Sequence, residues 1–333
     1  MRELLSVAKV NLMRPSLKII GMILLLVCSG WGFFGHRTIN RLAVFTLPPE
    51  MIVFYKHHIE YIADASVNPD RRRYAIKDEA PRHFIDLEDY GDSALLKLPK
   101  YWKDAVDQMG EDSLQAHGIV PWHIVRMVHQ LRDAFLLQDP QRILRCSAEL
   151  GHYVSDSNVP LHTTNNHNGQ LTGQVGIHGL WESRLPELFA DQYNFFTGKA
   201  SYEEDPQSRS WEAVRRAHAM LDSVLNEERI LSINQASSKY NYETKGRQTV
   251  RVYSSSFSRM YHDRLAGMVE RQMRASIKMT GDLWFTAWVD AGQPDLNRLI
   301  GYTPTPEEAK IHKDELEKWK KQVYAPRPHE NEP

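Results

Sequence analysis

Apolar residues recur at intervals of three and four along most of the chain, which predicts helices joined by polar loops. Pro121 and Pro140 each stand near the start of such a pattern, where the fixed φ of proline suits the first helical turn. Alternating patterns typical of strands are short and few. We therefore predict a single all-α domain over residues 31–303, with helices over 121–137, from 139 onward, over 205–233 and over 253–289.

The two ends of the chain differ from this domain. Residues 1–18 carry four basic residues and one acid, and an apolar run over 19–27 follows. Nine residues span about 14 Å as a helix, roughly half a bilayer core. Small residues then follow at 28–30, which predicts a signal peptide over 1–30 and an exported, periplasmic or secreted protein. An uncleaved anchor, a buried helix and lipid attachment at Cys28 are the alternatives. At the other end, residues 304–333 predict a charged helix over 304–319 and a flexible tail over 325–333.

Composition narrows the class of function. The 333 residues include 41 Lys and Arg against 42 Asp and Glu, so the formal net charge of −1 gives no general attraction to nucleic acid. Removal of residues 1–30 would leave 37 bases (41 − 4) and 41 acids (42 − 1). Two cysteines exclude a disulfide scaffold and a cysteine-rich zinc finger. Fifteen histidines are the unusual feature, and histidine is the commonest metal ligand.

Two motifs have the spacing of metal ligands. His152 and Asp156 are four residues apart, so both side chains leave one face of a helix, and His162 follows after Pro160 ends that helix. His178 and Glu182 repeat the four-residue spacing on a further predicted helix. For the first motif, the alternative interpretation is a helix-capping Asp156 with two incidental histidines. For the second, it is a surface hydrogen bond between His178 and Glu182.

A third motif surrounds His83, in the segment Arg82–Asp86. A carboxylate partner for this histidine could be Asp64, Asp70 or Asp78, and the sequence pattern alone leaves the choice open. Without a partner, His83 would be an ordinary core histidine. The arginine run 71–73 is typical of a solvated face, although one member could hold a phosphate.

The fourth motif lies directly after the predicted cleavage point. Cleavage before Trp31 would create a free amine beside its own carbonyl oxygen, and His36 could complete a chelate with them. The alternative is an aromatic segment that only packs on the core.

Taken in order, these motifs resemble the zinc-dependent phospholipase C and single-strand-specific nuclease superfamily. The resemblance covers residues 31–182 and implies an all-α fold with three zinc ions in a cleft. It implies the following ligands: Asp70, His83, His152 and Asp156 for one zinc; His162, His178 and Glu182 for a second; and the Trp31 amine and carbonyl, His36 and a shared Asp156 for the third. Asp70 is preferred because Asp70 and Arg73 imitate the family's Asp-x-x-Arg, and Asp64 is the fallback.

The resemblance further implies metal-assisted hydrolysis of a phosphodiester. Zinc would acidify a water molecule, Asp70 would orient or deprotonate it, and Arg73 would meet the developing phosphate charge. Glu182 as the last ligand resembles the phospholipase branch, and Ser183 departs from the Asn of the nucleases. We therefore expect a phospholipase C-like enzyme acting on a phospholipid head group, as a monomer without a stable protein partner. The alternatives are a nuclease acting on single-stranded nucleic acid, a non-catalytic periplasmic zinc-binding protein, and a helical interaction protein.

Overall fold

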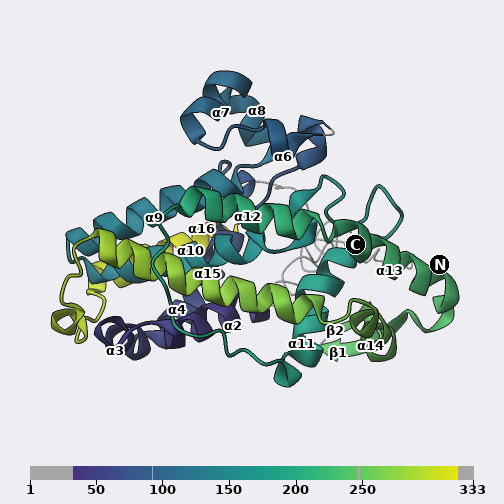
Figure 1. Cartoon of the computed structure of the whole chain (residues 1–333). Coiled ribbons are helices and arrows are strands. Elements are labelled where there is room, and N and C mark those ends of the chain that lie inside the picture. Colours follow the sequence, from purple (N-terminus) through teal and green to yellow (C-terminus); the bar gives the residue numbers. More distant parts are fainter. Residues whose placement is uncertain (1–32, 92, 246–247, 322–333) are drawn as a thin grey trace, which may run out of the picture.

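The computed structural model describes residues 33–91, 93–245 and 248–321, and these residues form a bundle of helices (Figure 1). The all-α fold class is confirmed, since the strands among these residues form one two-stranded sheet. None of the helices in these ranges is long and apolar enough to cross a membrane. The predicted signal peptide over 1–30 and the tail over 325–333 lie outside the described residues.

The first half of the chain forms short helices followed by the two long helices of the core. Their bounds are α2 (Phe33–Ala43), α3 (Pro49–His57), α4 (Ile59–Ala65), α5 (Asn68–Arg72), α6 (Ala94–Lys97), α7 (Trp102–Met109), α8 (Glu111–His117), α9 (Val120–Leu136) and α10 (Pro140–Ser157). Short 3₁₀ turns connect some of them: η2 (Val44–Thr46), η3 (Ala80–His83) and η4 (Leu87–Tyr90).

The second half returns along the same core. Its elements are η5 (Pro160–Thr163), the π-helical turn η6 (Gly179–Arg184), α11 (Leu185–Phe189), η7 (Ala190–Gln192), α12 (Pro206–His218), α13 (Leu221–Asn234), η8 (Ala236–Ser238), β1 (Tyr240–Lys245), β2 (Gln248–Tyr253), α14 (Ser255–Arg264), α15 (Met268–Asp290), η9 (Leu296–Leu299) and α16 (Pro306–Lys320).

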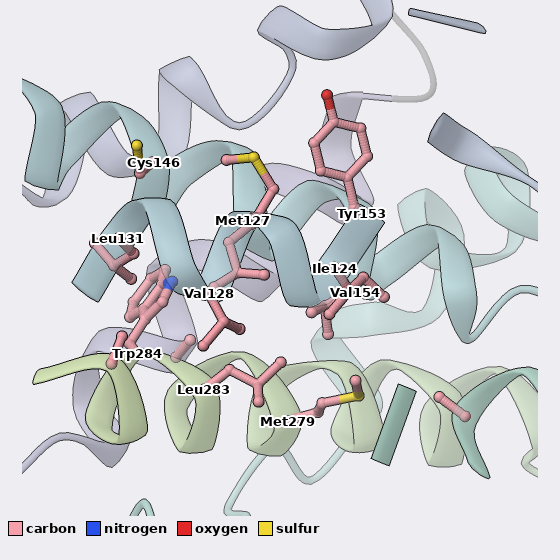
Figure 2. Close-up of a cluster of buried hydrophobic side chains, with 14 of the residues drawn as sticks. Ile124, Met127, Val128, Leu131, Cys146, Tyr153, Val154, Met279, Leu283 and Trp284 are labelled. Carbon is pink, nitrogen blue, oxygen red and sulfur yellow. The ribbon is translucent and has the colours of Figure 1, made fainter. Parts of the chain in front are cut away.

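Helices α9, α10 and α15 form the centre of the main core. Figure 2 shows Met279, Leu283 and Trp284 of α15 facing apolar side chains of α9 and α10. Trp284 is fully buried, and its indole N–H donates to the carbonyl of Ser147 over 3.0 Å, so its polar atom is satisfied inside the core. This packing fixes α10, whose C-terminal half carries His152 and Asp156.

The start of α10 is set by local chemistry that the sequence pattern anticipates. The Asp139 carboxylate accepts from the Arg142 backbone N–H over 3.0 Å, and Pro140 occupies the first turn. Gln138 takes a φ of 52°, which turns the chain between α9 and α10. The two helices therefore begin within one residue of their predicted starts at 121 and 139.

A second apolar cluster lies around α11, α13, α14 and the hairpin, at the right of Figure 1. The strands pair antiparallel, with Tyr240 opposite Tyr253 and Tyr242 opposite Arg251. This hairpin was not predicted, and the continuous helical patterns over 205–233 and 253–289 were wrong in detail. The first breaks between α12 and α13, and the second breaks at Gly267, whose φ of 74° ends the helical path.

The charged segment near the C-terminus is helical, as its composition predicts. Helix α16 begins with a capping box, in which the Thr305 hydroxyl accepts from the Glu308 N–H and the Glu308 carboxylate accepts from the Thr305 N–H.

A close contact between α2 and α10 leads to our first prediction. A Cβ atom at Gly151 would lie 1.9 Å from Oδ1 of Asn40, and the Asn40 amide donates to the carbonyl of Ala148 over 2.9 Å. Gly151→Ala should push α2 away from α10 and lower the free energy of unfolding by about 1–3 kcal/mol. Urea titration measures this loss. Equal stability of Gly151→Ala and the wild type would contradict the tight contact.

Candidate metal centre

Eight buried histidine and carboxylate side chains converge from separate elements of the fold. Helix α10 supplies two of them from one face, and short turns supply most of the others. The residues are His36 from α2, Asp70 from α5, His83 from η3, His152 and Asp156 from α10, His162 from η5, His178 just before η6, and Glu182 within η6. Trp31, the remaining predicted ligand, lies outside the described residues.

The first group joins His83, His152, Asp156 and Asp70. Nδ1 of His83 lies 2.9 Å from Oδ2 of Asp156 and 3.0 Å from Nε2 of His152. Oδ1 of Asp70 lies 3.8 Å from each of these two ring nitrogens. Four potential ligand atoms therefore face one small volume from three elements, and they are the atoms of the four residues that the resemblance groups together.

The second group joins His162, His178 and Glu182. Oε2 of Glu182 lies 2.7 Å from Nε2 of His178 and 3.2 Å from Nε2 of His162, and the two nitrogens are 3.2 Å apart. The predicted helix at this motif is a π-helical turn. Pro186 cannot donate to the carbonyl of Glu182, four residues earlier, and its ring crowds that carbonyl, which accounts for the wider turn.

His36 joins the two groups. Its Nε2 lies 3.5 Å from Oδ1 of Asp156, 3.5 Å from Oε1 of Glu182 and 3.9 Å from Oδ2 of Asp70. Its ring stacks on that of His152, with the ring centroids 4.1 Å apart. Asp156 thus faces His83 and His152 with one oxygen and His36 with the other, an arrangement in which one carboxylate can bridge two cations.

Contacts outside the cluster fix the orientation of one histidine ring. Nδ1 of His162 lies 2.6 Å from the backbone carbonyl oxygen of His83, and only a protonated nitrogen can donate to that oxygen. The hydrogen therefore lies on Nδ1, and the lone pair of Nε2 is directed toward Glu182 and His178. This is the tautomer that a metal ligand needs.

The carboxylates of the cluster are ionised in spite of their burial. Burial alone would raise their pKa values, but the surrounding histidines hold the pKa of Asp156 and that of Glu182 well below the usual range and lower that of Asp70. Burial would also lower the pKa of His36. The carboxylates of Glu182, Asp156 and Asp70 outweigh that effect and raise it to about 10. The cluster is thus a concentration of buried negative charge that attracts cations.

The structure decides which acidic residue accompanies His83. Asp70 lies in the cluster, whereas the side chain of Asp64 is 69% exposed and pairs with Arg37, and Asp78 is exposed. Arg73 is buried, with its Nε 3.8 Å from Oδ1 of Asp70, so its guanidinium lies at the edge of the cluster. The interpretation of the arginine run as a solvated face is therefore wrong at Arg73.

The donor set and its unsatisfied atoms fit zinc. Both ring nitrogens of His36, Oδ1 of Asp70 and Oδ1 of Asp156 are buried and have no hydrogen-bond partner among the described residues. Such atoms are costly in a protein interior unless they bind a ligand or an ion. Imidazole nitrogen and carboxylate oxygen are the atoms that bind zinc in protein sites that contain no cysteine ligand. Among the described residues, the ligand atoms form four overlapping groups of three: one in each of the two clusters and two that include His36.

The loop over 165–176, which separates the two metal motifs in the sequence, borders the second group. The ring centroid of His167 lies 6.4 Å from that of His178. The backbone N–H of Gly176 donates to the side-chain oxygen of Asn168 over 3.0 Å, which fixes the loop shortly before His178.

One buried acid beside the cluster was not identified from the sequence. Glu79 is fully buried, and its carboxylate lies behind His83, on the side away from Asp156. Burial would raise the pKa of Glu79, but the His83 ring and the Arg72 guanidinium hold it well below the usual range. The four-residue spacing between Glu79 and His83 repeats that of the metal motifs, and this spacing is the signal that could have identified it.

A family model described as S1/P1 Nuclease matches residues 31–276, well over half of the chain. No curated protein matches the chain significantly. The matched range contains every residue of the candidate metal centre and begins at Trp31.

Proposed function

Because the chain belongs to the S1/P1 nuclease family, whose members are zinc-dependent phosphodiester hydrolases, we propose that its substrate is single-stranded nucleic acid. The observation that carries this proposal is the convergence of the eight buried ligand residues within the matched range. The family match favours the nuclease over the phospholipase C-like enzyme expected from Glu182 and Ser183. A carboxylate at position 182 can bind a cation whether its side chain is that of Asp or Glu, so its length is a weak indicator of substrate.

Three zinc ions would be held by the groups described above. The first would be bound by Asp70, His83, His152 and Asp156, the second by His162, His178 and Glu182, and the third by His36 and the second oxygen of Asp156. Trp31 would complete the third site if cleavage makes it the N-terminal residue. This requirement connects the proposed site to export, since a signal peptidase would create the free amine.

Bound zinc would supply Lewis acidity toward the phosphoryl oxygens and would acidify a coordinated water. The protein's own residues would do the rest. Asp70 is ionised, so its carboxylate oxygen that is not assigned to zinc can orient an attacking water and accept its proton. Arg73 lies next to this carboxylate and carries a permanent positive charge that can stabilise the phosphate as charge develops. Bound zinc and Arg73 would thus supply the positive charge toward the phosphate that the net charge of the protein does not provide.

Parallel hydrolysis assays test this function. Purified protein with its zinc content measured is incubated with single-stranded DNA, duplex DNA, RNA and phosphatidylcholine vesicles. We expect cleavage of single-stranded DNA and RNA, slow cleavage of the duplex and no release of phosphocholine. Lipid hydrolysis without nucleic-acid cleavage would restore the phospholipase C function. Bound zinc without turnover of any substrate would indicate a non-catalytic zinc-binding protein.

A further inference from the structure

Glu79 is held in one orientation by four donated hydrogen bonds. Arg72 donates from Nε to Oε2 over 2.8 Å and from Nη2 to Oε1 over 3.1 Å. Arg82 donates to Oε2 over 2.6 Å, and the hydroxyl of Tyr153 donates to Oε1. These donors belong to α5, η3 and α10, so the carboxylate is fixed relative to three of the elements that form the metal centre.

His83 lies between this carboxylate and the ligand cluster. Its Nδ1 faces Asp156, at 2.9 Å from Oδ2, whereas its Nε2 is 3.7 Å from Oε1 of Glu79. Among the described residues, Nε2 has no hydrogen-bond partner at shorter range. A neutral imidazole carries one N–H, and a nitrogen that binds a cation must be the other one. Binding through Nδ1 therefore requires the hydrogen on Nε2, facing Glu79.

We propose that Glu79 is a positioning residue for the metal centre, which orients the His83 ring and holds its hydrogen on Nε2. The distance of 3.7 Å is longer than a hydrogen bond, so the ring would move toward Glu79 by less than 1 Å to close it. Carboxylates that accept from ligand histidines raise the basicity of the ligand and fix its tautomer. This inference rests on the proposed function to the extent that His83 is a zinc ligand.

The competing explanation is that Glu79 only neutralises the buried Arg72. Glu149 separates the two explanations. It accepts from Nη1 of Arg72 over 2.7 Å, whereas Glu79 accepts from Nε and Nη2 on another edge of the same guanidinium. Replacement of either Glu79 or Glu149 by glutamine removes one of the negative charges that contact the Arg72 guanidinium. Only replacement of Glu79 also removes the carboxylate that faces Nε2 of His83.

The experiment compares Glu79→Gln with Glu149→Gln in the otherwise unchanged protein. Zinc affinity is measured by competition with a chromophoric chelator, and the visible spectrum of the cobalt-substituted protein reports the ligand geometry. We expect Glu79→Gln to weaken the affinity of one zinc about 10- to 100-fold and to alter the cobalt spectrum, as is usual for loss of a carboxylate behind a ligand histidine. Glu149→Gln should retain the wild-type spectrum and affinity within about threefold.

Equal changes in the two variants would overturn the positioning role. Glu79→Asp provides a second measurement if Glu79→Gln does not fold, because it keeps the charge beside Arg72 and withdraws the carboxylate from His83 by one carbon–carbon bond. Weakened zinc binding in Glu79→Asp supports the proposal, and wild-type affinity overturns it. Failure of the wild-type protein to bind zinc would instead overturn the proposed function, so the two failures are distinguishable.

Discussion

Replacement of Asp156 by asparagine is expected to remove nearly all hydrolytic activity. Asp156 faces His83 and His152 with one oxygen and His36 with the other, so it serves two of the three proposed zinc sites. The amide group of asparagine has one oxygen and a nitrogen that cannot bind a cation. We expect kcat/KM on single-stranded DNA to fall at least about a thousandfold, equivalent to about 4 kcal/mol of transition-state stabilisation.

The matched control is Asp64→Asn. It makes the same chemical change at an exposed acid on α4, whose partner is Arg37 at 3.3 Å. This variant should keep wild-type activity within about twofold, since exposed ion pairs contribute little. Zinc content measured on both variants shows whether the loss follows the metal. Activity of Asp156→Asn within tenfold of the wild type would exclude a bridging role for this carboxylate.

The parts of the fold that were predicted from the sequence are those with local signals. Helices α9 and α10 have prolines in their first turns, and Asp139 caps α10 with its own side chain. The hairpin has no such signal, because neither face is uniformly apolar: Arg251 lies on the face of the tyrosines, and Glu243 lies opposite Val250 on the other face. Its position depends on contacts distant in sequence, such as the ion pair between Glu243 and Arg184. Propensity and pattern do not contain that information.

The same distinction applies to the metal centre. The pairs His152/Asp156 on α10 and His178/Glu182 at η6 could be recognised because the two residues of each pair are only four positions apart in the sequence. The pattern around His83 left Asp64, Asp70 and Asp78 open, and only the family resemblance favoured Asp70. The structure places Asp70 in the cluster and Asp64 outside it. Glu79 was missed although it lies four residues before His83. Its other partners, Arg72 and Tyr153, come from different elements, and only the fold brings them to its carboxylate.

The protein without metal should be much less stable than the zinc-bound protein. In the metal-free cluster, the three ionised carboxylates of Asp70, Asp156 and Glu182 are buried close together. A protonated His36, whose pKa is raised to about 10, compensates part of this negative charge. Bound zinc would replace that proton with a double charge and would satisfy the oxygens that lack a hydrogen-bond partner among the described residues, so binding should stabilise the folded state relative to the unfolded chain.

Removal of zinc with a chelator, followed by dialysis, should therefore lower Tm by at least about 10 °C, since each kcal/mol shifts Tm by roughly 2–4 °C in a domain of this size. Differential scanning calorimetry at pH 7 measures the change. Zinc added back should restore Tm, whereas magnesium should not, because histidine nitrogens are poor ligands for it. The wild-type Tm retained after removal of all zinc would show that the buried cluster is stable without a cation. Fewer than two zinc ions per chain before removal would contradict the proposed three-zinc centre.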